Sequence, residues 1–384
     1  MIKFKWETEF KKTEIGEIPG EWDIVELGKL ADIKTGKTNV QDAVESGEYP
    51  LFDRSYEFKK SNKYLFDTEA VIVLGEGKDF LPRYYIGKFD LHQRTYAIFN
   101  FQQNLKGKYL YFTMFILRYY LREWAVGSTV LSLRLLLFKQ LPILLPPSPE
   151  QSRIATVLSW FDDLIENKKR QNEILEKTAM AIFKSWFVDF ELFKDEEFVY
   201  SEELGKEIPK GWEIKAIGEV VDILYGRGLP ESKRKNGSFP VVGSSGIVGY
   251  HAQFLATPPS IVIGRKGNAG SVYLMLEPFY PIDTVFYTGK TTPAITFYIY
   301  HHLKLTPLAE IGMTDTAVPG ININNLKAVK ISIPLQPILQ HFHSLVEPLF
   351  QKIIFNQRQI MVLRKIRDAL LPKLIFGKLR VEVI

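Results

Sequence analysis

Two sets of basic and hydrogen-bonding side chains stand in glycine-flanked loops, one set in each half of the chain. Lysine and arginine bind phosphate, and Arg, Lys, Asn, Gln, Ser and Thr hydrogen-bond to the edges of bases. These are the side-chain types that a nucleic-acid contact would use, and the alternative is that their charges are only solvated. The predicted residues are Lys34, Lys37, Thr38, Asn39, Arg54, Ser55, Lys78 and Arg83, and then Arg227, Ser232, Lys233, Arg234, Lys235, Asn236, Ser244, Ser245, Arg265, Lys266 and Asn268.

Patterns that would indicate catalysis fail on spacing. Gly36-Lys37-Thr38 and Gly289-Lys290-Thr291 lack the glycine five positions earlier that a phosphate-binding loop needs. Glu191-Leu192-Phe193-Lys194 has the wrong spacing for a Glu-x-Lys nuclease element, and the sequence holds no Asp/Asn-Pro-Pro-Tyr motif of adenine methyltransferases. With no Cys and six scattered His, no metal site is predicted. We expect a non-catalytic chain.

The composition is that of a folded protein with well-filled cores. Hydrophobic residues make up 46% and aromatic residues 13% of the 384 residues, and the net charge of +5 permits nucleic-acid binding without requiring it. No apolar run reaches the roughly 18 residues of a membrane span. The first residues, Met1 to Glu7, lack the apolar core of a signal peptide. The predicted location is the cytoplasm, with no membrane partner.

The loops are positioned by an internal duplication. Glu17-Ile18-Pro19-Gly20-Glu21-Trp22 recurs as Glu207-Ile208-Pro209-Lys210-Gly211-Trp212. At the same offset the Gly36 turn matches Gly226, and further along each copy a Val/Ile run recurs at Val71–Val73 and Ile261–Ile263. The two copies differ most in the basic loops, so one framework carries two different sets of surface residues.

Each copy is predicted to be an α+β domain. Short β-rich runs lie between Gly, Pro and Asn turns, and one aromatic helix follows in each copy. The predicted strands are Ala70–Leu74, Tyr96–Phe101, Leu141–Pro146, Ser260–Ile263, Val285–Tyr287 and Val329–Pro334, and the predicted helices are Tyr109–Trp124 and Ile295–Leu303.

A long helix follows each domain. The first begins with the capping-box pattern of Ser148, Pro149 and Gln151, and the second begins at Pro337. Both carry apolar residues in two rows of a heptad pattern, which we call the seam, with a polar break near its middle. The seam residues are Ile154, Leu158, Phe161, Ile165, Lys168, Asn172, Leu175, Ala179, Ile182 and Trp186 in the first helix, and Phe342, Val346, Leu349, Ile353, Asn356, Ile360, Leu363, Arg367, Leu370 and Leu374 in the second.

These motifs together resemble the specificity subunit of Type I restriction–modification enzymes. The resemblance rests on Thr13–Pro19 and Leu204–Trp212 at the start of each copy, on the helix starts, and on the tail Leu370–Leu379. It implies two target-recognition domains that each read half of a split double-stranded DNA sequence. It also implies two modification (methyltransferase) subunits, which bind S-adenosylmethionine and methylate adenine, and two restriction subunits, which use ATP and Mg²⁺. No cofactor is expected in this chain.

The predicted fold is therefore α+β, with two duplicated target-recognition domains joined by two long helices in an antiparallel coiled coil with pseudo-two-fold symmetry. The predicted parts are a first target-recognition domain at 1–147, a spacer helix at 148–190, a connector at 191–206 with a charged, exposed stretch at Lys194–Lys206, a second target-recognition domain at 207–335, and a C-terminal helix with its tail at 336–384. The predicted role is a non-catalytic DNA-specificity subunit that recruits methyltransferase and restriction subunits. A duplicated protein-binding scaffold without DNA readout is the alternative.

Two further alternatives stay open at this stage. Side-facing apolar residues of the helices, such as Phe183, Phe187, Ile354 and Phe355, would either dock partner subunits or cover the bases of the domains. An enzyme fused to recognition modules is the third reading of the whole chain, and the missing catalytic motifs argue against it.

Overall fold

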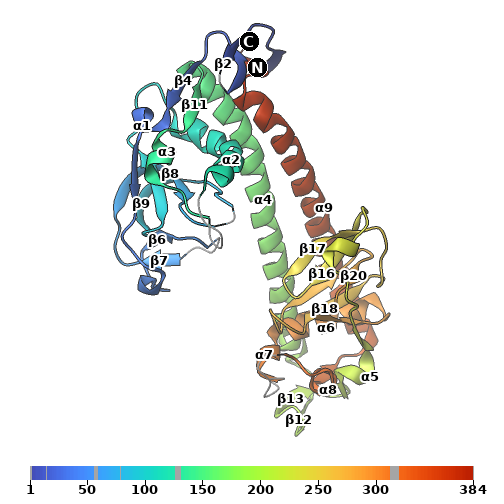
Figure 1. The fold of residues 1–384 in the computed structure, drawn as a ribbon. Coiled ribbons are helices and arrows are strands. Elements are labelled where there is room, and N and C mark those ends of the chain that lie inside the picture. The colour runs from blue at the N-terminus through green and yellow to red at the C-terminus, as the bar shows by residue number, and fades with distance from the viewer. Residues whose placement is uncertain are drawn as a thin grey trace. The chain divides into compact units, whose positions relative to one another are not determined.

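The computed structural model describes residues 2–13, 15–55, 59–77, 79–125, 131–311 and 320–383. The chain divides into two compact units, Met1–Lys169 with Gln357–Ile384 and Arg170–Asn356. The boundary cuts both long helices, α4 (Ser148–Phe187) and α9 (Gln336–Ile375), so each unit holds one half of each helix (Figure 1).

The first unit is built on a six-stranded sheet in the order β5-β10-β8-β9-β6-β7. Helix α2 follows β10, which is the last of these strands in the sequence. The buried face of α2 contributes to the larger apolar core of the unit. Besides its halves of α4 and α9, the elements are β1 (Ile2–Trp6), β2 (Phe10–Thr13), β3 (Gly16–Pro19), β4 (Asp23–Glu26), α1 (Leu27–Leu30), β5 (Asp32–Thr35), η1 (Val40–Asp42), β6 (Tyr49–Phe52), β7 (Lys59–Ser61), β8 (Phe66–Leu74), β9 (Arg83–Leu91), β10 (Thr95–Phe99), α2 (Gly107–Trp124), α3 (Leu135–Lys139), β11 (Pro142–Leu145) and β23 (Leu379–Val383).

The second unit has a four-stranded sheet in the order β15-β21-β18-β19 and a three-stranded sheet in the order β17-β16-β20. Its helix α6 is almost entirely buried. The elements are η2 (Glu191–Phe193), β12 (Phe198–Ser201), β13 (Lys206–Pro209), β14 (Glu213–Ala216), α5 (Ile217–Val220), β15 (Ile223–Tyr225), η3 (Glu231–Lys233), β16 (Phe239–Gly243), β17 (Gly246–His251), β18 (Ser260–Gly264), β19 (Val272–Met275), β20 (Tyr280–Pro281), β21 (Val285–Thr288), α6 (Pro293–Leu305), α7 (Leu308–Ile311), α8 (Ile323–Ala328) and β22 (Lys330–Ile333).

The duplication predicted from the sequence is confirmed by matched contacts. The strand that follows the repeated Trp of each copy (Trp22 and Trp212) pairs antiparallel with the strand before each long helix, β4 with β11 and β14 with β22. A buried Tyr of the aromatic helix donates its hydroxyl to a carbonyl of that last strand, Tyr109 to Leu144 and Tyr298 to Ser332. The two units therefore share one framework, although their main sheets differ in strand number.

Within each unit the halves of α4 and α9 pack in opposite directions. In the first unit Arg367 forms an ion pair with Asp162 at 2.6 Å. In the second unit Asn356 donates to Asn172 at 2.9 Å, and the Trp186 and Phe342 rings are 6.1 Å apart. Every predicted seam residue is buried or half-buried, and Asn356 fills the predicted polar break. The supercoil and the two-fold relation stay predictions. No helix among the described residues is long and apolar enough to cross a membrane.

The capping box predicted at the start of α4 is wrong. The buried Gln151 side chain donates to the carbonyls of Pro146 and Asn104 at 2.8 and 2.7 Å, and it accepts from the Lys106 N–H at 2.9 Å. A buried amide group needs partners for its oxygen and nitrogen. The loop that leads into α2 supplies them, so Gln151 fastens α4 to that loop instead of closing a box with Ser148.

The segment 191–206, predicted as a connector, is part of the second unit. Phe193 is buried beside Trp212, with ring centres 5.3 Å apart. Strands β12 and β13 then form an antiparallel hairpin. Its charged residues Asp195, Glu196, Glu197, Glu202 and Glu203 are exposed, and the aromatic residues beside them anchor the segment to the core of the second unit.

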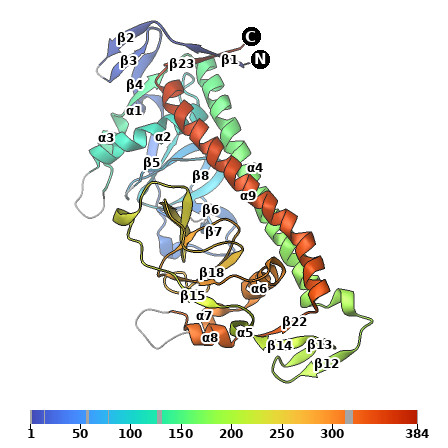
Figure 2. The same cartoon turned by 90° about the vertical axis from the view of Figure 1, so that its right-hand side faces the viewer.

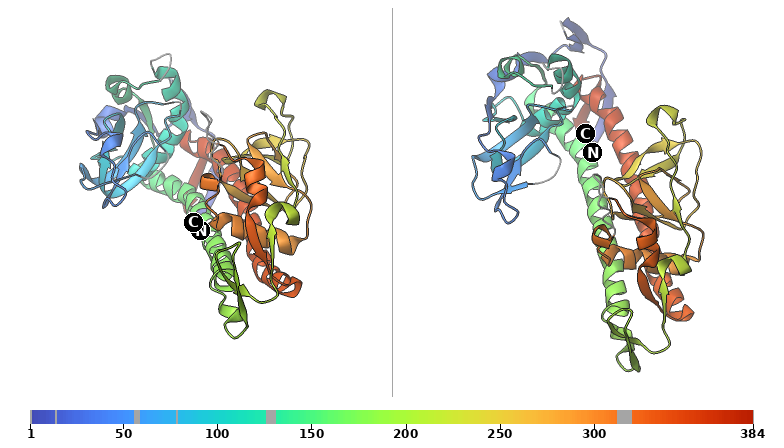
Figure 3. Two further views of the ribbon diagram at one scale, coloured as in Figure 1. Left: turned by 90° about the horizontal axis from the view of Figure 1, so that it is seen from below. Right: turned by 60° about the horizontal axis from the view of Figure 1, so that its bottom comes forward.

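The first unit closes on itself through its two ends. Strand β23 pairs antiparallel with β1, from Ile2 opposite Val383 to Trp6 opposite Leu379. Figures 2 and 3 show the two ends of the chain next to each other. This sheet completes the first unit from residues that follow the whole of the second unit in the sequence.

Arg380 in β23 is the centre of a charged cluster in the first unit. Its guanidinium donates to Glu150 and Glu21, each at 2.6 Å, and to Glu7, and it lies 5.7 Å from the centre of the Trp22 ring. Glu150 is 2% exposed and also accepts from the Trp22 indole at 3.2 Å. The cluster ties together β1, the start of α4 and the C-terminal strand.

His301 lies in the core of the second unit, and we expect it to make that unit sensitive to acid. Its ring stacks on Phe183 at 5.5 Å, its Nδ1 lies 2.7 Å from the Phe297 carbonyl, and its buried Nε2 has no hydrogen-bond partner among the described residues. Burial lowers the pKa of His301 from 6.5 to about 4.

In the unfolded state His301 is therefore protonated below pH 6.5, whereas in the folded state it stays neutral down to about pH 4. The free energy of unfolding should fall by about 1.4 kcal/mol per pH unit across this window, and by roughly 3 kcal/mol in all. Urea unfolding of the protein and of His301→Phe between pH 7.5 and 4.5 measures the difference. A difference between the two proteins that stays constant with pH would contradict the assignment.

Candidate nucleic-acid interface

Four loops of the first unit meet through backbone hydrogen bonds. They are 36–39, 52–55, 75–77 and 91–95. The Thr38 N–H donates to Leu91 at 3.2 Å, His92 to Phe52 at 2.9 Å, and Gly75 to Arg94 at 2.9 Å. We call this set the first loop cluster. Gly36 is required here, because a Cβ at that position would lie 1.8 Å from the Leu91 carbonyl oxygen.

Five of the eight sequence-predicted residues of the first unit, Lys37, Thr38, Asn39, Arg54 and Ser55, come together in this cluster, but in different roles. Lys37, Asn39 and Arg54 are exposed. Thr38 is buried and donates its hydroxyl to Asp90 at 2.8 Å, and Ser55 bonds to Asp53, so both hold the loops in place. Lys34 is exposed on β5, where its amine lies 5.5 Å from the Phe99 ring. Lys78 lies outside the described residues.

The arginines in the first loop cluster, and Arg83 beside it on β9, are engaged within the protein. Arg54 and Arg94 both form ion pairs with Glu76. Arg83 donates to the Ser55 carbonyl and lies 5.8 Å from the Phe52 ring. The cluster is therefore a network of charged groups that is already hydrogen-bonded before any ligand arrives.

Arg94 and Gln93 belong to the first loop cluster and were not predicted from the sequence. Gln93 donates to the Asn39 side chain at 2.6 Å. Both lie in the short turn between β9 and β10, which reads from the sequence as a simple strand connection. The signal in the sequence that would have found them is the polar pair Gln93-Arg94 in the short turn between two strand-forming runs.

The second unit has a corresponding loop cluster, formed by loops 226–228, 243–245, 264–271 and 281–284. The Arg227 N–H donates to Pro281 at 3.0 Å and the Arg265 N–H to Thr284 at 2.9 Å, and the Ser271 hydroxyl donates to Ser244 at 2.7 Å. We call it the second loop cluster. A Cβ on Gly226 would lie 2.0 Å from the Ile282 carbonyl oxygen, so the Gly36/Gly226 match marks the same close contact in both units.

The predicted residues of the second unit fall into two groups. In the second loop cluster Arg227, Ser245, Lys266 and Asn268 are exposed, and Ser244 and Arg265 are half-buried. None of the three basic residues in this cluster forms an ion pair with another described residue, in contrast to Arg54 and Arg94 of the first cluster. The second cluster therefore presents three basic side chains against one acidic residue, the exposed Asp283.

The other group lies beside β17. Ser232, Lys233, Lys235 and Asn236 are exposed there. Arg234 is different, since its guanidinium donates to the Val248 carbonyl at 2.8 Å and holds the segment against the strand. Four of these five residues thus present side chains to solvent, and Arg234 acts inside the protein.

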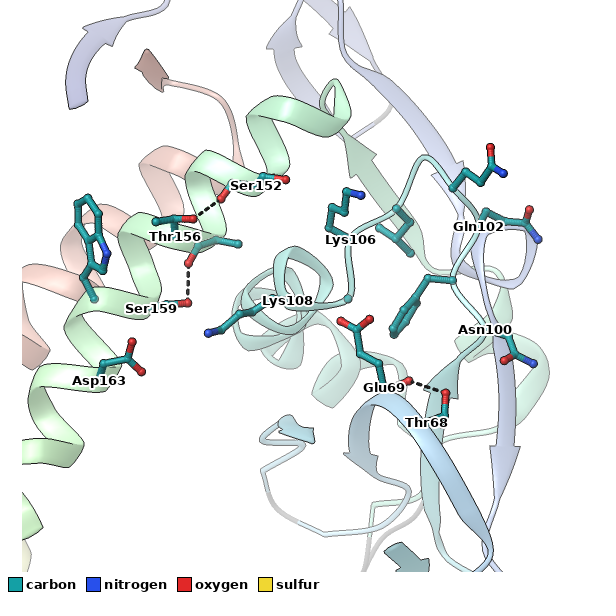
Figure 4. Close-up of a pocket in the computed structure, with 16 residues that line it drawn as sticks. Thr68, Glu69, Asn100, Gln102, Lys106, Lys108, Ser152, Thr156, Ser159 and Asp163 are labelled. Atoms are coloured by element: carbon teal, nitrogen blue, oxygen red, sulfur yellow. Dashed lines mark hydrogen bonds between the residues drawn. The ribbon is translucent and has the colours of Figure 1, made fainter. Parts of the chain in front are cut away.

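The first unit also contains a cavity of about 670 Å³ away from its loop cluster, between α4 and the segment that leads into α2 (Figure 4). Ser152, Thr156 and Ser159 line it from α4, and each donates its hydroxyl to a carbonyl four residues earlier, at 3.2, 2.8 and 2.6 Å. These hydroxyls are engaged with the helix backbone and not with a general base, so the cavity holds no activated nucleophile among its described residues.

Comparison with known proteins points to one family. A family model described as the Type I restriction modification DNA specificity domain matches residues 19–177 and again 209–363. The MjaIX specificity subunit of a Type I restriction enzyme from Methanocaldococcus jannaschii is 37% identical over 427 residues, which cover 100% of this chain and 99% of the relative.

A second relative and one solved structure agree with this match. The EcoDI specificity subunit from Escherichia coli is 32% identical over 171 residues, 44% of this chain and 38% of the relative. The crystal structure of the S subunit of a Type I restriction–modification system from M. genitalium aligns with a TM-score of 0.59 at 21% identity, covering 92% of this chain and 96% of that one. This structural similarity supports the same fold for the two proteins.

Proposed function

Because the chain belongs to the family of Type I restriction–modification DNA specificity subunits, we propose that it recognises a bipartite, asymmetric DNA target. As a member of this family it is a non-catalytic subunit that recognises DNA sequence. In our proposal residues 1–147 read one half-site, residues 207–335 read the other, and the two long helices set the distance between the halves.

The observation that carries the proposal is the contrast between the two loop clusters. Both clusters lie on the same framework, and in both a glycine, Gly36 or Gly226, packs closely against a backbone carbonyl oxygen. The first is an ion-pair network around Glu76, whereas the second presents unpaired Arg227 and Lys266. Two readers with different side chains suit a target whose halves have different sequences.

The same proposal includes partner subunits on the helices. Two modification subunits and two restriction subunits would join the complex, and these would carry S-adenosylmethionine, ATP and Mg²⁺. Phe183 and Phe187 are buried in the core of the second unit, so they cover the base of that unit. Other apolar helix residues are more than 40% exposed and would face the partners: Trp160, Leu164, Ile174, Leu345, Phe355, Val362 and Ile366.

Methylation mapping tests the proposed function. The chain is co-expressed with a Type I modification subunit that it binds, and the genomic DNA is sequenced for N6-methyladenine. A split motif with one methylated adenine in each half, which disappears when the chain is omitted, is the expected result. A stable complex that methylates no such motif would contradict DNA readout and favour a protein-binding scaffold.

A further inference from the structure

We infer that Arg265 reads a guanine in the half-site contacted by the second unit, and that Tyr225 is the positioning residue that holds its guanidinium for this contact. The inference rests on the proposed function and deepens it by naming a base and the residue that recognises it. Arg265 stands in the second loop cluster, directly after strand β18.

The Arg265 side chain is held against aromatic rings. Its guanidinium carbon lies 5.1 Å from the centre of the Tyr225 ring and 5.8 Å from that of Phe286. Tyr225 and Phe286 are opposite each other on the paired strands β15 and β21. A guanidinium above aromatic faces is stabilised by cation–π attraction, and its planar donor group loses less freedom when it binds.

The backbone of Arg265 is fixed as well. Its N–H donates to Thr284 at 2.9 Å, and its carbonyl accepts from the Ile321 N–H at 3.1 Å. Both neighbouring segments therefore hold the residue from which the side chain extends. A residue restrained at its backbone and at its guanidinium can discriminate between ligands by position, which a freely moving side chain does poorly.

The guanidinium of Arg265 nevertheless makes no hydrogen bond and no ion pair with another described residue. Arg54 and Arg94 of the first loop cluster, and Arg83 beside it on β9, all donate to protein acceptors. Arg265 thus presents unused donors in a fixed plane, next to the exposed Lys266 and Asn268. The natural ligand is a planar group with two acceptors.

Guanine presents such a group in the major groove, where O6 and N7 accept two hydrogen bonds from one arginine. A phosphate also accepts two hydrogen bonds from arginine, but a positive charge within reach is enough to bind it. The exposed Lys233, Lys235 and Lys266 of the second unit supply that charge on flexible side chains. The restrained, half-buried Arg265 is therefore assigned to the base and the lysines to the backbone of the DNA.

The test compares four single variants in the complex used for methylation mapping: Arg265→Lys, Tyr225→Phe, Tyr225→Leu and the control Arg122→Lys. Arg122 is exposed on α2 of the first unit, outside both loop clusters. Arg265→Lys keeps the charge but loses the planar pair of donors. It should reduce discrimination for guanine at one position of one half-site by roughly ten- to a hundredfold, with the other positions unchanged.

Tyr225→Phe keeps the ring and should keep the guanine, whereas Tyr225→Leu should broaden the same position as Arg265→Lys. Arg122→Lys should leave the motif unchanged. Thermal melting of each complex shows that the variants are folded. If Tyr225→Leu does not fold, Arg265→Lys still decides the guanine contact, and a motif that changes in the folded Tyr225→Phe variant would contradict a role of the ring alone.

Three results would overturn the inference. The first is an unchanged motif in Arg265→Lys while the wild-type chain specifies a bipartite target, which leaves the proposed function standing. The second is an equal loss at all positions with a smaller salt dependence, which would assign Arg265 to a phosphate. The third is the absence of any motif with the wild-type chain, which removes the proposed function together with the inference.

Discussion

Replacing Arg380 with methionine is expected to lower the free energy of unfolding of the first unit by about 3–5 kcal/mol, because it leaves a buried carboxylate without its partner. Glu150 is 2% exposed, and its other described hydrogen bond comes from the Trp22 indole. The Arg380 side chain is itself only 15% exposed, so water does not replace it at low cost. The C-terminal strand would also lose its ion pairs with Glu7, Glu21 and Glu150, while its ladder with β1 remains.

Urea unfolding followed by tryptophan fluorescence measures this loss. Lys210→Met is a matched control, because its ion pair with Glu197 is exposed, with side chains 61% and 68% accessible, and should contribute at most about 1 kcal/mol. The double variant Glu150→Gln with Arg380→Met removes both charges and should recover part of the stability. A loss in Arg380→Met no larger than that of the control would show that Glu150 finds another partner or water.

Deleting one heptad from each long helix is expected to abolish methylation at the wild-type spacing and to produce the same two half-sequences with a shorter gap. Seven residues correspond to about 10 Å of helix, or roughly three base pairs of DNA. Residues 163–169 and 360–366 are suitable, because their removal keeps the heptad register, the Asp162–Arg367 ion pair and the Asn172–Asn356 hydrogen bond.

The control for this deletion removes the seven residues from α4 alone, which shifts the two helices relative to each other and should give an unfolded or inactive chain. Methylation mapping provides the readout for both. A change in the half-sequences themselves, with the gap unaltered, would contradict the idea that the helices set the spacing, since each half-sequence belongs to a domain that the deletion leaves intact.

The sequence predicted those parts of the fold whose signal is local or repeated. Helix α4 begins at Ser148 as expected, since a proline in the first turn and an uninterrupted heptad pattern act within neighbouring residues. The duplication predicted that Gly36 and Gly226 share a role, and the structure shows the same close approach of a backbone carbonyl at both. The aromatic helices and the strands before α4 and α9 follow the predicted ranges closely.

The pairing of β1 with β23 had no such signal. The two strands stand at opposite ends of the sequence, and short amphipathic runs pair with many partners equally well until the rest of the fold brings them together. The burial of Glu150 follows from the same contact, because Arg380 reaches it only through β23. Gln151 was assigned to a capping box since its distant partners at Asn104 and Lys106 were invisible in the sequence.

The candidate interface shows a similar division. Composition located the loops, but the side chains within them differ by contacts that only the folded chain defines. Thr38 and Arg234 have the right chemistry for DNA and use it on Asp90 and the Val248 carbonyl. Tyr225 was missed because an aromatic residue before a glycine turn resembles the end of a buried strand, whereas its side chain is 50% exposed beneath Arg265.

The way in which the first unit is assembled from two separate segments has a consequence for the order of events on the ribosome. The second unit is continuous, from Arg170 to Asn356, so all of its residues have been synthesised before Gln357 is added. The first unit still lacks its half of α9, strand β23 and Arg380 at that moment. The domain that comes first in the sequence is therefore the last to be completed during translation, and until then Glu150 has no guanidinium to neutralise it.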